Sequence, residues 1–217
     1  MAARNSKGVE IFMTAATAAA TDITPTGITS ASPAVVSSAD TVANGDVIYV
    51  PAGATGMPSL DGNYFVVANA NAGSDFELLG SDATGDTYAA GTTPELKAYD
   101  DTDMVKLCLS SMTFNPEQAS TVSAGTYCDP SQSVPGLVAG AGTVDIAGYV
   151  DITDADYAAL IAAEADGNSR TFRIMLPSNG YVIFPGVISS LNLDIPIDGA
   201  IAWSAQVALG SKPKHLF

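Results

Sequence analysis

The stretch of residues 171–209, TFRIMLPSNGYVIFPGVISSLNLDIPIDGAIAWSAQVAL, constrains the fold of this chain more than any other. Two turn sequences, Pro-Ser-Asn-Gly at 177–180 and Pro-Ile-Asp-Gly at 196–199, divide it into three segments. In such turns the proline presets φ, and the glycine takes the positive φ that the corner needs. The segments are rich in β-branched and aromatic residues, and apolar and polar residues alternate at 191–195. We therefore predict three antiparallel strands, the middle one unusually long, with one polar face.

The preceding residues predict more β structure. Between residues 28 and 100, short apolar segments alternate with turns rich in Gly, Asp and Asn, which favours a small β-barrel or sandwich of its own. These segments lie at residues 34–37, 47–50, 64–67 and 75–79. Further strands are expected at 9–14, at 104–109 with an extension to 114, and at 143–151. The flanks of the 28–100 region are rich in Gly, Ala and Asp, and residues 8–96 contain no Lys or Arg, which is typical of the edges of an insertion.

One segment, residues 153–166, has a helical pattern. Thr153 as N-cap and Asp156 three residues later form a capping-box arrangement. Tyr157, Leu160 and Ile161 form an apolar stripe, and a glycine follows the last turn. We expect this helix to cover one face of the sheet formed by residues 171–209.

The predicted fold class is therefore mainly β. It comprises an antiparallel β-sandwich or barrel with one short helix, plus an inserted small β-barrel-like module. Residues 1–27 would begin the main domain, residues 28–100 would form the inserted module, and residues 101–217 would complete the main domain.

The charge balance limits the partners of the chain. There are 23 acidic residues against 8 basic ones, giving a net charge of -15, and residues 8–96 and 107–169 contain no Lys or Arg. Nucleic-acid binding depends on Lys and Arg that neutralise phosphates and release counterions. Most of this chain cannot bind nucleic acid in that way. The acidity either keeps the protein soluble or provides a surface that does not retain a polyanion.

A search for catalytic or metal-binding patterns predicts no such site. The single histidine, His215, lies near the end of the sequence, where we expect a frayed terminus rather than a catalytic pocket. Cys108 and Cys128 show no zinc-ligand spacing, and they are either paired on neighbouring strands or free and buried. The acidic residues 99–103 lack the Gly and Glu of a calcium loop. Acids for a glycosidase pair are plentiful, but the one tryptophan, Trp203, is expected in the core rather than in a sugar platform.

Localisation signals are weak. No apolar run approaches the roughly 20 residues of a membrane helix, so no membrane association is expected. Two basic residues before a partly apolar stretch faintly resemble a signal peptide, but Glu10 and several threonines interrupt that stretch.

Several short motifs, in order and spacing, resemble one protein family. They are KGVEI at 7–11, GTYCD at 125–129, AGYVD at 147–151, FRIMLP at 172–177, FPGVISS at 184–190 and DGAIAWS at 198–204. The chain resembles the major tail tube protein of long, non-contractile-tailed bacteriophages. The segments NGDVIYV at 44–50, LDGNYFVV at 60–67 and DFELL at 75–79 resemble a small β module inserted in many phage tail proteins. That module is similar to a half-domain of ubiquitin-activating enzymes, without their catalytic machinery.

The resemblance implies a structural virion protein with no catalytic, cofactor or metal site. Such subunits self-assemble into stacked hexameric rings, and the tube is an acidic conduit through which DNA passes during genome ejection without specific binding. Its partners would be tail-tip and head-proximal terminator proteins and, before ejection, the tape-measure protein inside the tube. Assembly would take place in the host cytoplasm, and the inserted module would lie on the outer surface.

We expect three acids in or beside strands of the polar face to face the lumen: Asp145, Asp194 and Asp198. The alternative function is a phage surface or decoration protein whose β module binds a host receptor or a carbohydrate.

Overall fold

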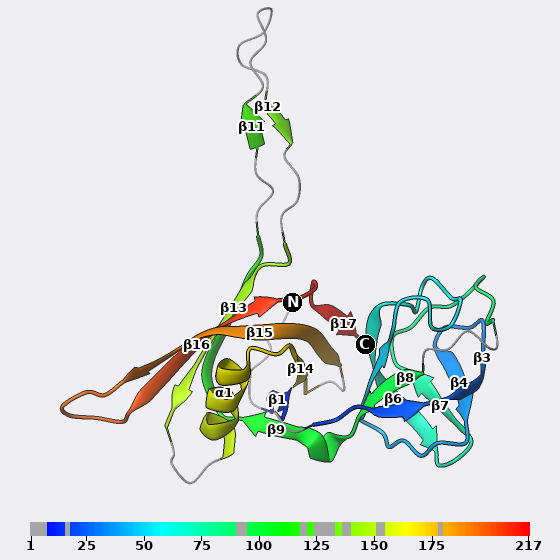
Figure 1. Ribbon diagram of the computed structural model, residues 1–217, viewed down its shortest axis with the longest axis horizontal. Coiled ribbons are helices and arrows are strands. Elements are labelled where there is room, and N and C mark those ends of the chain that lie inside the picture. Colours follow the sequence, from blue (N-terminus) through cyan, green and yellow to red (C-terminus); the bar gives the residue numbers. More distant parts are fainter. Residues whose placement is uncertain are drawn as a thin grey trace, which may run out of the picture. The chain divides into compact units, whose positions relative to one another are not determined.

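The computed structural model describes residues 8–15, 18–89, 95–117, 121–123, 133–135, 140–150, 155–177 and 180–217. The chain divides into two compact units. The first comprises Met1–Leu107, Arg170–Phe184 and Pro213–Phe217, and the second comprises Cys108–Ser169 and Pro185–Lys212. Antiparallel strands make up most of the described residues, together with one α-helix (Figure 1). The predicted fold class, mainly β and antiparallel with one short helix, is confirmed.

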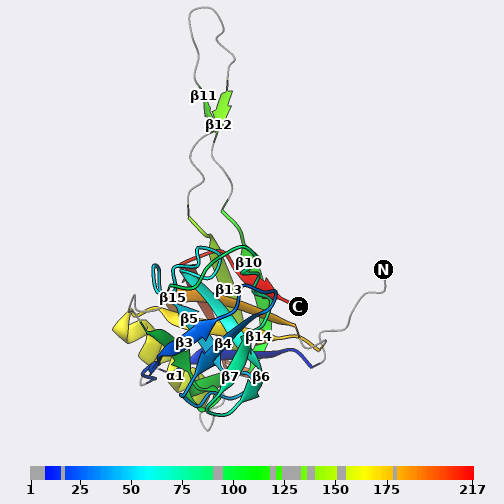
Figure 2. The ribbon, with the colours of Figure 1, turned by 90° about the vertical axis from the view of Figure 1, so that its right-hand side faces the viewer.

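Seven strands of the first unit form a barrel-like sheet. In the order of their pairing they are β2 (Thr21–Ile23), β8 (Leu96–Tyr99), β5 (Val47–Val50), β6 (Asn63–Asn71), β7 (Asp75–Leu78), β4 (Ala34–Ser38) and β3 (Pro25–Ile28). The two end strands, β2 and β3, are separated in the sequence by Thr24 alone, so the sheet nearly closes on itself. Figure 2 shows β3, β4, β6 and β7 turned toward the viewer.

Alternation along these strands gives the barrel a closed apolar interior. In β4 the alternate residues Ala34 and Val36 are fully buried, whereas Val35 between them is only partly buried. The interior is filled by side chains from every strand of the barrel and from its loops: Ile23, Ile28, Ala34, Val36, Val42, Ile48, Val50, Ala54, Met57, Leu60, Phe65, Val67, Phe76, Leu78, Ala83, Leu96 and Ala98. This burial is the main stabilising contribution to the barrel.

The other strands of the first unit form an antiparallel sheet. Its members, in the order of pairing, are β9 (Met104–Leu107), β1 (Glu10–Thr14), β14 (Arg170–Met175), the first residues of β15 (Tyr181–Asp194) and β17 (Lys214–Leu216). Leu216 is fully buried in a cluster with Val47, Val66, Met104 and Ile183. Gly80 has a φ of +68°, and a Cβ there would lie 3.2 Å from the Cα of Leu216. The glycine therefore allows the close approach of the last strand.

A buried arginine connects three segments of the first unit. Arg173 on β14 donates hydrogen bonds to the carbonyl of Gly45 and to the carboxylate of Asp101, with which it forms an ion pair. Its guanidinium lies 4.6 Å from the centre of the Phe12 ring on β1. Asp101 begins the 3-10 helix η1 (Asp101–Asp103), which is capped by the side chain of Asp100. The acidic segment 99–103 thus takes part in an ion pair with an almost fully buried base.

The second unit contains a four-stranded antiparallel sheet. Its order is β10 (Leu109–Asn115), β13 (Thr143–Tyr149), β16 (Ala202–Leu209) and the later residues of β15. Figure 1 shows β15 and β16 as one long hairpin, drawn in orange and red. The unit also contains the helix α1 (Ala155–Asp166) and a two-stranded ladder of β11 (Thr121–Ser123) and β12 (Ser133–Pro135).

Several local predictions need correction. Residues 104–114 are two strands with different partners, not one extended strand, because β9 pairs with β1 and β10 pairs with β13. In α1 the buried residues are Asp156, Leu160 and Ala163, whereas Ile161 is 45% exposed. The predicted N-cap, Thr153, lies outside the described residues. The carboxylate of Asp156 also has a role outside the helix. Its Oδ2 accepts a hydrogen bond of 3.2 Å from the backbone N–H of Cys108, which precedes β10.

Two further predictions concern His215 and the cysteines. His215 does not lie in a frayed terminus, because it pairs with Val182 in the ladder between β17 and β15. Cys108 is free but exposed, not buried. Cys128 lies outside the described residues, as do the GTYCD motif and most of the long loop around it.

Candidate functional site

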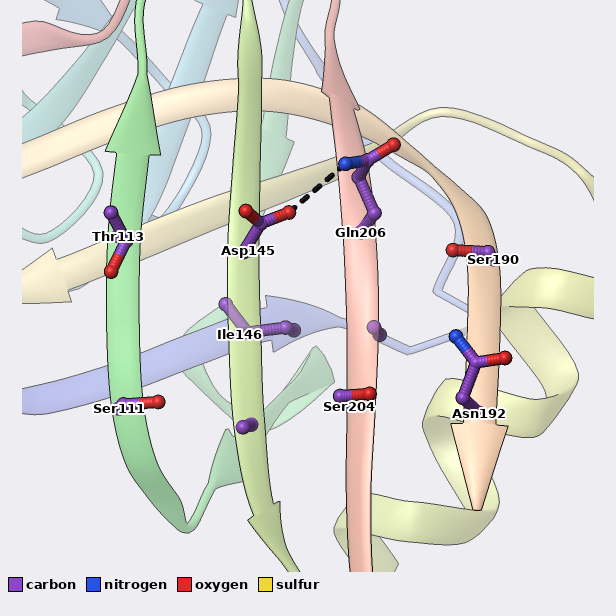
Figure 3. Close-up of a pocket in the computed structure, with 10 residues that line it drawn as sticks. Ser111, Thr113, Asp145, Ile146, Ser190, Asn192, Ser204 and Gln206 are labelled. Carbon is purple, nitrogen blue, oxygen red and sulfur yellow. Dashed lines mark hydrogen bonds between the residues drawn. The ribbon is translucent and has the colours of Figure 1, made fainter. Parts of the chain in front are cut away.

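One face of the four-stranded sheet in the second unit is lined by small polar side chains. Figure 3 shows these side chains on four neighbouring strands, where they surround a shallow depression of about 290 Å³. The polar lining residues are Ser111 and Thr113 on β10, Asp145 on β13, Ser204 and Gln206 on β16, and Ser190 and Asn192 on β15. Hydroxyl and amide groups therefore dominate this surface, which we call the polar face.

The register of the strands explains why these side chains gather on one face. Thr113 pairs with Asp145, and Asp145 pairs with Gln206, so that their side chains point to the same side. Gln206 in turn pairs with Ser190, and Ser204 pairs with Asn192. A row of polar residues thus crosses the whole sheet.

Both outer strands of this sheet contain a bulge. The register shifts between Leu109 and Ser111 on β10 and between Ile188 and Ser190 on β15. In each case the extra residue is a serine whose hydroxyl donates to a backbone carbonyl of the inner strand: Ser110 to Ala147, at 3.1 Å, and Ser189 to Gln206, at 3.0 Å. Bulges increase the local twist and bend a strand. They also set which residues of β10 and β15 point to the polar face.

On the opposite face of the same sheet, the residues of the two central strands β13 and β16 are apolar and buried. Trp203 is 1% exposed, which confirms the prediction that it lies in the core. Its indole Nε1–H donates to the carbonyl of Tyr149 at 3.3 Å. Gly148 lies against its ring, where a Cβ would come within 2.7 Å of Cζ2. The buried alternate positions are Val144, Ile146, Trp203, Ala205 and Val207. Burial of this face fixes the orientation of the polar one.

The structure places the three predicted acids at different positions. Asp145 lies in the middle of the polar face, where its Oδ2 accepts from Asn115 at 2.6 Å and its Oδ1 accepts from Gln206 at 3.0 Å (Figure 3 shows the latter bond). Asp194 ends β15 and pairs with Ala202, so it shares the alternation of Asn192. Asp198 lies in the exposed turn between β15 and β16. The three acids do not form a cluster.

Sequence reasoning missed the hydroxyl and amide side chains that dominate the polar face. The alternation of Ser204 and Gln206 with Trp203, Ala205 and Val207 is visible in the sequence. It would have identified these two residues as members of a polar row. Ser111 and Thr113 carry no such signal, because their position depends on the bulge in β10.

The turn of the β15–β16 hairpin is unusually apolar for an exposed segment. Ile197 is fully exposed, Ile195 is 67% exposed and Leu193 is 47% exposed. Together with Ile201, at 37%, they form a surface that we call the apolar tip. Large exposed apolar surfaces in soluble proteins usually mark contact sites.

Almost every described base already has a partner. Lys97 is paired with Asp22, Lys106 with Glu10 and Arg173 with Asp101. Arg170 is buried and donates to the carbonyl of Ala15. Lys212 is the one base in the described ranges that is exposed and has neither an ion-pair nor a ring partner.

The remaining described base, Lys214, is half-buried. Its Nζ lies 3.4 Å from the centre of the Phe65 ring. Burial lowers the pKa of Lys214 to about 8, and the ring face opposes that shift because it favours the charged form. Neither this lysine nor any other base in the described part of the chain lines the depression of the polar face.

No group of three or more metal-ligating side chains occurs within the residues that the structure describes. In the same residues, no helix has the length and apolar character needed to span a membrane.

Comparisons with known proteins give limited matches. No protein-family model and no curated protein sequence matches the chain. A chain in a structure described as "Virion of native gene transfer agent (GTA) particle" has a TM-score of 0.36 and 19% identity, covering 51% of this chain and 86% of that chain. A chain in "Tail of empty GTA particle computed with helical refinement, C6 symmetry" has a TM-score of 0.35 and 20% identity, covering 49% and 79%. Since TM-scores this low do not establish a common fold, we infer the function from the residues and geometry of the chain itself.

Proposed function

We propose that this protein is a structural subunit of a phage-type tail tube, in which copies join edge to edge and the polar face lines the channel. The observation that carries the proposal is the two-faced sheet of the second unit, which is apolar on one side, with its central strands buried there, and polar on the other, where no described base lines the depression. The sequence motifs that resemble tail tube proteins lie largely in this sheet and its neighbours. In this function the chain carries no catalytic site.

Two free strand edges support the joining of copies. In the described residues β10 pairs only with β13, and its sequence LSSMTFN contains neither Lys nor Pro to protect the edge. On the other side of the sheet, residues 190–194 of β15 pair with β16, and no other strand register within the described residues includes them. The six-residue strand β14 is too short to reach them after its turn. Two different free edges on opposite sides of one sheet favour head-to-tail contacts, which close into a ring when the rotation allows it.

The apolar tip supports the same proposal. It lies at the end of the hairpin that carries one of the two free edges, so a second copy pairing along β15 would lie beside it. Burial of Ile195 and Ile197 against that copy would remove apolar surface from water, at about 25 cal/mol per Å². We therefore take the apolar tip as part of the contact between copies.

The remaining parts of the proposal concern ring symmetry and partners. We propose hexameric rings that stack in the virion, with tail-tip, terminator and tape-measure proteins as partners, and assembly in the host cytoplasm. We place the barrel, predicted from the sequence as an inserted module at residues 28–100, on the outer surface. The alternative is a surface or decoration protein whose barrel binds a host receptor or a carbohydrate, and its carbohydrate form is less well supported. Within the described residues of the barrel, no large apolar side chain is exposed that would serve as a sugar platform.

Negative-stain electron microscopy of the purified full-length chain at increasing concentration tests the proposal. We expect hollow tubes with a regular axial repeat. Replacing Leu193 on the free edge of β15 with lysine should keep the protein in small species, because a charged edge resists strand pairing. The matched variant Leu193→Met should assemble like the unmodified chain. A chain that stays monomeric at every concentration, or a Leu193→Lys variant that assembles normally, would contradict the proposal.

A further inference from the structure

The polar face is nearly uncharged although the chain as a whole carries a net charge of -15. Among the ten residues that line its depression, Asp145 is the one ionisable side chain. Asp194 lies beyond the depression, at the end of β15. The acids that dominate the composition of the chain therefore lie mostly elsewhere.

Asp145 is also engaged by its neighbours. One carboxylate oxygen accepts from the Asn115 amide at 2.6 Å and the other accepts from the Gln206 amide at 3.0 Å. Amide groups carry no net charge, so neither bond introduces a base into the face. Hydrogen bonds to a charged group are stronger than those between neutral groups. The two amides therefore hold the carboxylate within the sheet surface instead of letting it extend away from it.

One carboxylate in the depression, with a second at the end of β15, repels a passing polyanion only weakly. Exposed charges separated by more than about 8–10 Å are largely screened at physiological ionic strength. A base would act differently, because a lysine that touches a phosphate releases condensed counterions and adds a contact that must be broken before the nucleic acid moves on. For DNA moving past this face, the absence of bases therefore matters more than the presence of acids.

We propose that the polar face is a neutral, hydrogen-bonding wall for passing DNA, with Asn115 and Gln206 holding its central carboxylate, and that it works by lacking bases rather than by acidic repulsion. This inference rests on the proposed function, and it proposes a neutral wall in place of the acidic conduit that the family resemblance implies. The hydroxyl and amide groups of the face form hydrogen bonds with water when no partner is present. A partner that slides along the face replaces these bonds with bonds of nearly equal strength, so its position changes the free energy little.

The test measures retention of a short duplex DNA by the full-length chain, using co-sedimentation of assembled protein at low and at physiological ionic strength. The unmodified chain and the double variant Asp145→Asn/Asp194→Asn should both fail to retain DNA. Ser204→Lys should retain it, with a salt dependence that steepens by about 0.9 in the log–log slope for each phosphate contacted.

Two results would overturn the inference. The first is DNA retention by the double asparagine variant as strong as that by Ser204→Lys, because the acids would then be what keeps DNA away. The second is a Ser204→Lys variant that does not retain DNA, because a base on the face would then have no effect. Failure of the proposed function is seen separately, as the absence of tubes by electron microscopy. Thermal unfolding of each variant confirms that the fold is intact.

Discussion

The barrel of the first unit and the four-stranded sheet of the second differ in how far their apolar side chains are exposed to solvent. The barrel encloses its apolar side chains almost completely, and within its described residues no large apolar side chain is exposed. Of the eight large apolar residues that are exposed in the described chain, seven lie in the second unit: Phe114, Tyr149, Ile161, Leu193, Ile195, Ile197 and Ile201. The eighth is Phe217.

The difference shows which part of the chain is complete by itself. The barrel sheet has a filled interior, its only unpaired edges are those of the short strands β2 and β3 within the described residues, and it leaves little apolar surface for a partner. The second unit keeps two free edges, an apolar tip and a base-free polar face. The apolar interior of the barrel is already filled, whereas we propose that the four-stranded sheet buries its remaining apolar surface only in an assembly.

The largest effect should come from the interior of the barrel. Phe76 is 2% exposed, and Phe76→Ala should lower the free energy of unfolding by about 3–5 kcal/mol, because the lost burial and the cavity add together. Urea denaturation of the unassembled chain measures this. Ile197→Ala, at a fully exposed position, is the control and should stay within about 0.5 kcal/mol. Equal losses in the two variants would remove the contrast between the units.

A second prediction concerns assembly instead of folding stability, and here Ile197 is the position expected to matter. Ile197→Ser should leave the unfolding of the unassembled chain unchanged but weaken association. Full burial of an isoleucine contributes about 1.5–3 kcal/mol, so the concentration needed for assembly should rise about tenfold or more. Light scattering against protein concentration measures this, with Ile197→Val as the conservative control. An unchanged assembly concentration would show that the apolar tip takes no part in the contact.

These contrasts could be predicted only in part from the sequence. Alternation and turn residues predicted the barrel strands β4, β5 and β7 and the long strand β15 to within a few residues. The strands β2, β3, β8 and β17 were missed, because each is short and its pairing comes from segments distant in the sequence. The strand β3 even contains a proline and a glycine. Its conformation follows from closure of the barrel, which overrides local preference.

The candidate site shows the same limit. Asp145 was predicted from the alternation within its own strand, and the structure places it in the middle of the polar face. Its partners Asn115 and Gln206 come from two other strands. Which residues of β10 stand beside it depends on a bulge that leaves no local signal in the sequence. The positions of these strands could be predicted from the sequence, but the register in which they pair could not.

A third prediction tests the buried arginine of the first unit. Asp101→Asn should lower the free energy of unfolding by about 1–3 kcal/mol, because the guanidinium of Arg173 loses a charged partner while it stays buried. Chemical denaturation measures the loss. Asp103→Asn in the same 3-10 helix is the matched control, and it should have little effect. A loss as large from the control would assign the effect to the helix rather than to the ion pair.

The smallest effect concerns pH. Because burial lowers the pKa of Lys214 to about 8 from its ordinary 10.5, the unfolded chain binds this proton more tightly than the folded chain. The free energy of unfolding should therefore rise with pH between these two values. Below about pH 8, Lys214 is charged in both the folded and the unfolded chain, and burial of its charge destabilises the fold fully. Partial exposure and the Phe65 ring reduce the size of the effect. Lys214→Met should remove this contribution, as seen by comparing the pH dependence of unfolding in the two proteins.

The central claim is that the free edges of β10 and β15 join neighbouring copies and thereby align their polar faces. Cysteine cross-linking tests it most directly. In a chain with Cys108→Ser and Cys128→Ser, the pair Thr113→Cys and Asn192→Cys places one thiol on each outer strand of the polar face. Treatment of assembled protein with a short bifunctional maleimide should give a ladder of covalent multimers, and the two single-cysteine variants should give dimers at most. Tubes that form without a ladder above these controls would contradict the claim.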